Sequence, residues 1–188
     1  MACTNKCLGI KLENKHHKVL LISTGGTIEK TYDESDGSLE NKRSVIMQKI
    51  SDNIRLPYTE LELEVILSKD SLYMTDQDRQ MICDYLQNRL KENLPIVVLH
   101  GTDTMEITAR YCFERIKSLK VPVIFTGAMV PLEFGKTDAV QNVTEALLAV
   151  KLVKPGFYIS FHNELFEVPC VRKNKDNRTF ESYTADAK

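Results

Sequence analysis

The chain has 188 residues, of which 43% are hydrophobic and 27% charged, and its formal net charge is −1 at pH 7. This composition is ordinary for a globular domain, and the charge gives no electrostatic reason to expect a nucleic-acid partner. Residues 1–18 are polar and no segment approaches the ~20 apolar residues that span a bilayer, so we expect no membrane association and a cytoplasmic location.

Predicted strands and helices alternate along the chain. An apolar run predicts a first strand at Lys18–Ser23, and a loop rich in Asp, Ser and Gly follows at Tyr32–Asn41. Thr75 and Asp78 form the Thr-x-x-acid pattern of a helix N-cap. Further strands are expected at 61–67, 96–99, 121–125 and 157–161, and helices at 44–50, 75–91, 104–118 and 138–153.

Short apolar strands separated by helices predict βαβ units and a doubly wound α/β fold. Right-handed crossovers place helices on both faces of a mainly parallel sheet, which gives a three-layer, Rossmann-like architecture. We expect a flexible tail at 1–17 and a single domain at 18–188. The polar segment from Asn163 onward is predicted to be a surface excursion.

Polar residues follow three of the predicted strands, at 23–27, 70–71 and 100–104. Ligands of open parallel sheets bind outside the carboxyl ends of the strands, so a shared, enzyme-like cleft is expected there. Thr27 follows two glycines and is either a nucleophile, a helix-capping residue in a glycine turn, or part of a weak phosphate nest. Thr102 and Asp103 are either capping residues or a hydroxyl and a carboxylate that holds a substrate ammonium.

Lys173 lies in a basic stretch at 172–178. A nearby cation favours the deprotonated form of a threonine, but a solvated basic segment is the alternative. Neither the Rossmann Gly-x-Gly-x-x-Gly pattern nor a Walker P-loop is present, which disfavours a nucleotide-binding domain. The five cysteines are scattered without a Cys-x-x-Cys pair. No metal site is therefore expected, and free thiols suit a reducing compartment.

Four motifs then occur in a specific order. Together they closely resemble the bacterial-type L-asparaginase family, and the likeness runs from about Lys18 to Tyr183. The motifs are Thr24-Gly25-Gly26-Thr27-Ile28, Asp70-Ser71-Leu72-Tyr73-Met74-Thr75, His100-Gly101-Thr102-Asp103-Thr104-Met105-Glu106 and Thr126-Gly127-Ala128-Met129-x-Pro131.

The resemblance implies a set of site residues. Thr27 matches the family nucleophile that forms an acyl-enzyme, and Thr102, Asp103 and Lys173 match a second catalytic cluster. Tyr32 lies closer to the first motif than the family's lid tyrosine does, so it serves through a rearranged loop or the role is absent. Residues that match substrate-binding positions are Gly26, Asp70, Ser71, Leu72, Gly101 and Ala128, with Asp103 and Ser71 at the α-amino and α-carboxylate ends and Ala128 near the oxyanion.

The implied reaction is hydrolysis of L-asparagine to L-aspartate and ammonia, without metal or cofactor. The chain has about half the family's usual length, so it resembles a short, single-domain branch. We also expect a homo-oligomer, either a dimer or a tetramer. Two alternatives stay open: an amidase that prefers L-glutamine or another amide, and an amino-acid-binding module without turnover.

Overall fold

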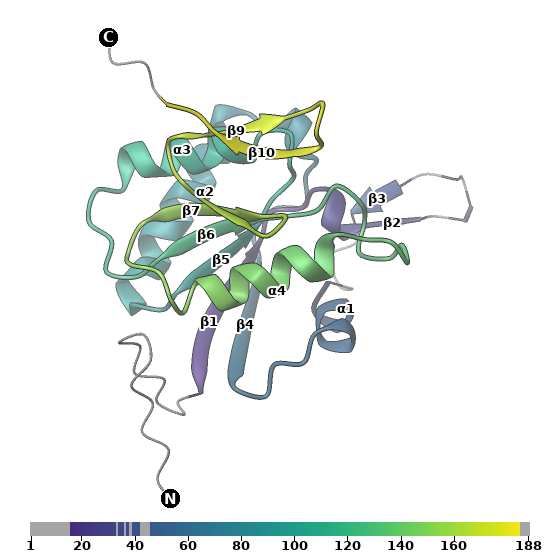
Figure 1. The fold of residues 1–188 in the computed structure, drawn as a ribbon, viewed down its shortest axis with the longest axis horizontal. Helices are drawn as coiled ribbons and strands as arrows, with labels where there is room; N and C mark the ends of the chain where they lie inside the picture. Colours follow the sequence, from purple (N-terminus) through teal and green to yellow (C-terminus); the bar gives the residue numbers. More distant parts are fainter. Residues whose placement is uncertain (1–15, 33, 36, 38, 42–45, 185–188) are drawn as a thin grey trace, which may run out of the picture.

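The computed structural model describes residues 16–184 apart from 33, 36, 38 and 42–45, so the tail expected at 1–17 lies almost wholly outside the described residues. Its centre is a six-stranded sheet in the order β4-β1-β5-β6-β7-β8 (Figure 1). The first five strands in this order, from β4 through β1 to β7, run parallel to one another. The last strand, β8, is antiparallel to β7. Their bounds are His17–Ser23 (β1), Thr59–Val65 (β4), Ile96–Leu99 (β5), Val123–Thr126 (β6), Phe157–Phe161 (β7) and Glu164–Glu167 (β8).

Helices cover both faces of this sheet. Helices α2 (Asp76–Arg89) and α3 (Met105–Arg115) pack on one face, and α1 (Ile46–Asn53) and α4 (Ala139–Ala149) pack on the other. Leu20 and Ile22 of β1 share a core cluster with α2 and α3, whereas Val19 and Leu21 share one with α1 and α4. Successive strand side chains point to opposite faces, so an unbroken apolar run suits a strand buried on both sides. This arrangement confirms the predicted three-layer α/β fold.

Short 3₁₀ turns and a capped helix follow the first strands. The turns η1 (Thr27–Glu29) and η2 (Ser71–Tyr73) come soon after β1 and β4, and η3 (Leu90–Glu92) ends α2. The predicted N-cap of α2 is confirmed, because Thr75 Oγ1 accepts the Asp78 N–H at 3.3 Å while the Asp78 carboxylate accepts the Thr75 N–H at 2.7 Å.

The segment after Asn163 is not the surface excursion that was predicted. It forms β8 and then a hairpin of β9 (Val171–Asn174) and β10 (Thr179–Ser182), which lies beside α3 (Figure 1). Phe166, Val171 and Phe180 are buried in the cluster that also contains α2 and α3. The prediction failed because each of these strands carries only one buried side chain, among mostly polar ones.

The loop predicted at 32–41 is also partly ordered into strands. β2 (Lys30–Tyr32) and β3 (Leu39–Asn41) pair as a small antiparallel hairpin, separate from the main sheet. Among the helices of the described residues, none combines the length and the apolar character needed to cross a membrane.

Candidate active site

The segments that follow β1, β4 and β5 touch one another at the carboxyl edge of the sheet. Gly26 has a φ of +91°, and a Cβ there would lie 2.4 Å from the Gly101 Cα. A Cβ on Gly101 would in turn lie 2.4 Å from Ser71 Oγ. Only glycine tolerates both the positive φ and the close backbone approach at Gly26. Three predicted site residues from separate strand ends are therefore in direct contact.

Thr27 follows Gly26 and begins the turn η1. Ile28 and Glu29, the next residues of the turn, are buried, whereas Thr27 itself is partly exposed. Within the described part of the chain the Thr27 hydroxyl makes no hydrogen bond, so it is available to a ligand. Thr27 and Thr102 each follow one of the two touching glycines, which places both threonines at the same contact.

A lysine from the β9–β10 hairpin completes a polar cluster with the segment after β5. Lys173 Nζ lies 2.8 Å from Thr102 Oγ1 and 2.8 Å from Asp103 Oδ1. The Lys173 side chain is 12% exposed and that of Asp103 is 43% exposed. The hairpin therefore brings a cation to the threonine and carboxylate, although 70 residues separate Lys173 from Asp103. The reading of Lys173 as part of a solvated basic segment is wrong.

Ser71, in the turn η2, forms hydrogen bonds with the segment that follows β5. Its Oγ accepts the Asp103 N–H at 3.2 Å, and its carbonyl oxygen accepts the Thr104 hydroxyl at 2.8 Å. Asp70 caps η2 by accepting the Leu72 N–H at 3.0 Å and pairs with Lys30 Nζ at 2.7 Å. The Leu72 side chain itself is exposed. The turn thus places a wholly buried hydroxyl, that of Ser71, against the backbone of Asp103, with the Asp70 carboxylate as its neighbour in the chain.

Two carboxyl groups near this edge have displaced pKa values. Burial of Asp70 opposes its ionisation, but the Lys30 ammonium and the Leu72 N–H outweigh it, so the pKa of Asp70 is lowered. Burial raises the pKa of the Glu106 carboxyl on the first turn of α3, although the charges of Lys173 and Arg110 oppose this. Sequence reasoning quoted Glu106 within a motif but gave it no role, because burial is what distinguishes this carboxyl.

His100 directly follows β5 and is wholly buried. Its Nδ1–H donates to the Gly101 carbonyl oxygen at 2.8 Å, and its Nε2 has no hydrogen-bond partner among the described residues. Burial lowers the pKa of His100 from its ordinary value of 6.5 to about 4, so the ring is neutral at pH 7. A neutral His100 therefore supports the backbone of Gly101 at the contact with Gly26.

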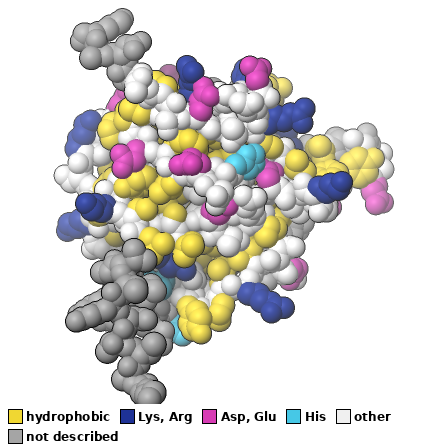
Figure 2. Space-filling view, viewed as in Figure 1, with side chains coloured by type: hydrophobic (Ala, Val, Ile, Leu, Met, Phe, Trp, Pro, Cys, Tyr) yellow, Lys and Arg dark blue, Asp and Glu magenta, His cyan; other side chains and the backbone are white. Residues whose placement is uncertain are grey.

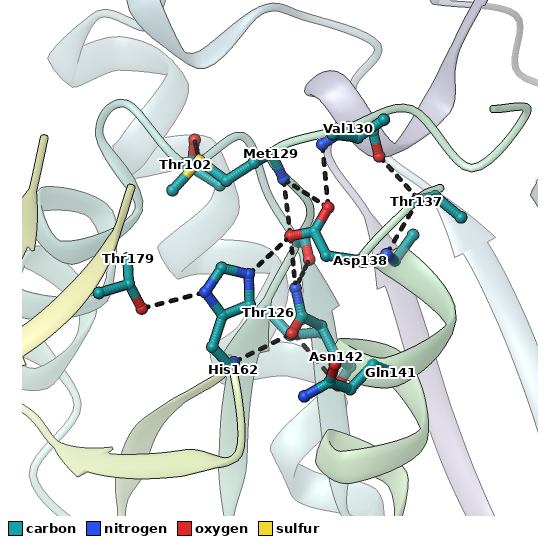
Figure 3. Close-up of polar contacts among 12 residues, drawn as sticks. Thr102, Thr126, Met129, Val130, Thr137, Asp138, Gln141, Asn142, His162 and Thr179 are labelled. Atoms are coloured by element: carbon teal, nitrogen blue, oxygen red, sulfur yellow. Dashed lines mark hydrogen bonds and ion pairs between the residues drawn. The ribbon is translucent and has the colours of Figure 1, made fainter. Parts of the chain in front are cut away.

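The segment that follows β6 carries Ala128 and Met129. Ala128 is buried, and the Thr102 hydroxyl donates to Met129 Sδ at 3.5 Å. Figure 3 shows that the N–H groups of Met129 and Val130 point at the carboxylate of Asp138, at the start of α4. Sequence reasoning missed this role of Asp138, because it treated the residue only as the beginning of a helix.

Tyr32 is not brought into hydrogen-bond contact with any other predicted site residue that the structure describes. It ends β2, its side chain is half exposed, and its N–H donates to the Glu133 carboxylate at 2.9 Å. A Cβ on Gly37 would lie 3.7 Å from the Tyr32 hydroxyl, so the ring lies along its own hairpin. The lid role of Tyr32 stays a prediction.

The cluster is built of hydroxyl, carboxylate and ammonium groups. Within the described ranges, no three His, Cys, Asp or Glu side chains are grouped so that they could hold a metal ion. A hydroxyl beside a held ammonium is suited to proton transfer to or from a substrate, because the cation favours negative charge on its oxygen. An exposed carboxylate beside it is suited to binding a cationic part of a substrate.

Comparison with known proteins gives consistent matches. The family model "Asparaginase, N-terminal" matches residues 18–187. An L-asparaginase of Thermococcus kodakarensis is 29% identical over 79% of this chain and 45% of its own length. The solved structure of a thermostable L-asparaginase from that organism matches 88% of this chain and 51% of its own, with a TM-score of 0.79 and 29% identity.

Other relatives carry different names. A 60 kDa lysophospholipase of Mus musculus is 32% identical over 65% of this chain and 22% of its own length. A glutamyl-tRNA(Gln) amidotransferase component from Methanococcus maripaludis is 27% identical over 87% of this chain and 39% of its own. The chain thus spans about half, or less, of the length of the relatives that it matches.

Proposed function

Because the chain belongs to the asparaginase family, we propose that it hydrolyses the side-chain amide of L-asparagine to L-aspartate and ammonia. Membership of this family supports the assignment of the chain as an amidohydrolase that acts on a small-molecule amide. Relatives of the chain include L-asparaginases. The observation that carries the proposal is the position of Lys173 Nζ, which lies 2.8 Å from both Thr102 Oγ1 and Asp103 Oδ1. Thr102 follows Gly101, and Gly101 contacts Gly26, the residue that precedes Thr27.

Thr27 is the proposed nucleophile. Its oxygen bonds to the amide carbon, its proton passes to the leaving nitrogen, and ammonia departs to leave an ester on Thr27. Water then cleaves the ester, releases L-aspartate and restores the hydroxyl. Ala128 lies on the segment proposed to face the oxyanion, where fixed N–H donors stabilise the developing negative charge. The partial exposure of Thr27 and its uncommitted hydroxyl support this role.

Thr102, Asp103 and Lys173 are proposed to act as one unit. The Lys173 ammonium favours negative charge on the Thr102 oxygen, which then moves protons between substrate and water. Asp103, the most exposed of the three, receives the α-ammonium of the substrate, and Ser71 receives the α-carboxylate. The remaining predicted contacts are Gly26, Asp70, Leu72 and Gly101 as lining of the pocket, with Tyr32 as the lid.

A second candidate is an amino-acid-binding module without turnover. The exposed Tyr32, which lacks a hydrogen bond to the described site residues, favours it. Under this alternative L-aspartate raises the melting temperature, as any ligand of the folded state does, but no ammonia is released. The names of the mouse and Methanococcus relatives also keep other substrates open, including L-glutamine.

The first experiment is a substrate panel. Ammonia release is measured for L-asparagine, L-glutamine and other side-chain amides, with purified protein at neutral pH. We expect the highest kcat/KM for L-asparagine. A higher kcat/KM for another amide would replace the substrate while keeping the chemistry. Stabilisation by L-aspartate without ammonia release would favour the binding module.

We also propose that residues 18–188 act as one domain in a cytoplasmic homo-oligomer, a dimer or a tetramer. Hydrophobic side chains are visible in Figure 2 over the part of the surface where Figure 1 shows α4. Leu148 and Leu152 are 58% and 48% exposed and line a cavity of about 200 Å³ with Leu165. Exposed apolar patches of this kind commonly mark contacts between proteins.

A further inference from the structure

Asp138 lies at the N-cap position just before α4, but its side chain makes no capping hydrogen bond to the helix. Its carboxylate accepts the N–H of Met129 at 3.0 Å and that of Val130 at 2.9 Å, and its side chain is 16% exposed. The hydroxyl of Thr137 accepts the Ala139 N–H instead, at 3.0 Å. Asp138 thus binds two N–H groups of the segment after β6, which carries Ala128, and makes no capping hydrogen bond to the N–H groups at the start of α4.

His162 reaches the same carboxylate from the turn between β7 and β8. Its Nε2 lies 3.0 Å from Asp138 Oδ2, and its Nδ1 lies 3.2 Å from Thr179 Oγ1 (Figure 3). Because a carboxylate only accepts, Nε2 carries the proton of this hydrogen bond. His162 and Asn163 form a two-residue turn with φ of +49° and +64°, where Asn, Asp and Gly are usual. A histidine at this position uses both ring nitrogens to join α4 to β10.

Asn142 connects the segment after β6, Asp138 and His162 through its side-chain amide. It is wholly buried on α4, and its Nδ2 donates to the Gly127 carbonyl oxygen at 2.9 Å and to Asp138 Oδ2 at 3.0 Å. Its Oδ1 accepts the His162 N–H at 3.0 Å. A buried network in which the polar groups are paired fixes one geometry of the chain. The segment after β6 is therefore held at both its carbonyl and its N–H groups.

The contacts of Asp138 and His162 lead in two directions to the proposed active site, one through Met129 and one through the β9–β10 hairpin. Met129, held by Asp138, accepts the Thr102 hydroxyl through its sulfur at 3.5 Å. On the other side Thr179 pairs with Asn174 across the hairpin. Lys173, the neighbour of Asn174, donates to Thr102 at 2.8 Å. Both ends of the network thus meet at the Thr102 hydroxyl.

We propose that His162 and Asp138 are positioning residues that fix the segment 127–130 and the β9–β10 hairpin relative to each other. Through this connection Met129 and Lys173 converge on Thr102 with a defined spacing. The inference rests on the proposed function, because the two residues are proposed to position groups that take part in catalysis. Displacement of catalytic groups by about 1 Å is enough to cost about a hundredfold in rate.

Three variants and one control test the proposal. His162→Phe keeps a ring against Phe161 but removes both side-chain hydrogen bonds, and His162→Gln restores a donor toward Asp138. Thr179→Val removes only the link to the hairpin. Gln141→Ala, an exposed position on the same helix whose amide contacts Glu145, is the control. Each variant is measured for kcat, KM, melting temperature and amide hydrogen exchange of segments 127–131 and 171–182.

We expect His162→Phe to lower kcat about tenfold to a hundredfold with KM nearly unchanged, and to speed exchange in both segments. His162→Gln should regain most of the lost kcat and restore slow exchange at 127–131. Thr179→Val should loosen only the hairpin, and Gln141→Ala should match the wild type. An unchanged kcat in folded His162→Phe, or a loss of kcat that His162→Gln does not recover, would overturn the proposal.

The two claims fail in different ways. If the wild-type protein releases no ammonia from any amide, the proposed function fails, and the exchange data decide the positioning role alone. Faster exchange in both segments of His162→Phe then supports the physical link between them. Unchanged exchange overturns that link, whatever the protein catalyses.

Discussion

Lys173 is the residue whose placement says most about the site. Its ammonium is largely buried and is shared between a hydroxyl and a carboxylate. We expect Lys173→Met to lower kcat by roughly 10²–10⁴-fold, because the Thr102 oxygen loses the charge that favours its proton transfer. Steady-state ammonia release measures the effect, with circular dichroism to check the fold.

Lys175→Met is the matched control for this change, since Lys175 lies in the exposed turn of the same hairpin. Its kcat should equal that of the wild type. Equal losses in the two variants would mean that the overall charge of the hairpin matters, and not the contact with Thr102.

His100 should make stability depend on pH. Its folded pKa of about 4 lies below the ordinary value of 6.5, so the unfolded chain binds a proton in this window that the folded chain excludes. The resulting stability is present above about pH 6.5 and is lost as pH falls toward 4, which amounts to about 2 kcal/mol between pH 7 and pH 5.

Denaturant unfolding of His100→Asn against wild type measures this contribution. Asn keeps a donor toward Gly101 but does not titrate in this range. The pH dependence of the unfolding free energy should therefore be shallower in the variant by about 2 kcal/mol over the same range. Identical slopes would show that His100 titrates normally in the folded protein.

Among the elements, the β9–β10 hairpin depends on a single aromatic anchor. Phe180 is 3% exposed, meets Phe161 edge to face at a centroid distance of 5.1 Å, and pairs with Lys173 across the hairpin. Phe180→Ala should cost about 3–5 kcal/mol of unfolding free energy and should also lower kcat of the folded fraction. A loss no larger than that of Phe113→Ala, a half-exposed position on α3, would show that the hairpin is not anchored in the core.

The parallel strands of the central sheet and the helices that cover it were predictable because each carries a continuous signal, whereas the antiparallel strand β8 does not. Ile96–Leu99 is wholly apolar, and Thr75 with Asp78 marks the start of α2 without reference to the rest of the fold. The strand-end positions of Thr27 and Thr102 follow from this pattern, since parallel strands end at one edge.

The hairpin and the network around His162 could not be found in this way. In β9 and β10 only Val171 and Phe180 are buried, which is too short an alternation to stand out among charged residues. The role of His162 depends on Asp138, 24 residues earlier, and on a turn with positive φ. Such contacts are set by the packing of the whole domain and have no local pattern in the sequence.

At the scale of the whole molecule, the candidate site lies at one edge of the central sheet, and apolar side chains are exposed on and after α4. Sedimentation velocity at micromolar concentration tests the proposed association. We expect a species heavier than the 21.5 kDa chain, and we expect Leu148→Lys to shift it toward the monomer, because a charge would be buried in the contact. A wild-type protein that sediments only as a monomer would contradict the proposal.

The most direct test of the central claim is ammonia release from L-asparagine by Thr27→Ala beside the wild type. Thr144→Ala is the control, because Thr144 is exposed on α4 and its hydroxyl contacts only its own helix. Covalent catalysis at Thr27 predicts that turnover is lost in Thr27→Ala and unchanged in Thr144→Ala, and that an aspartyl ester maps to Thr27 in quenched wild-type protein. Full activity of folded Thr27→Ala, or an ester on Thr102, would contradict it.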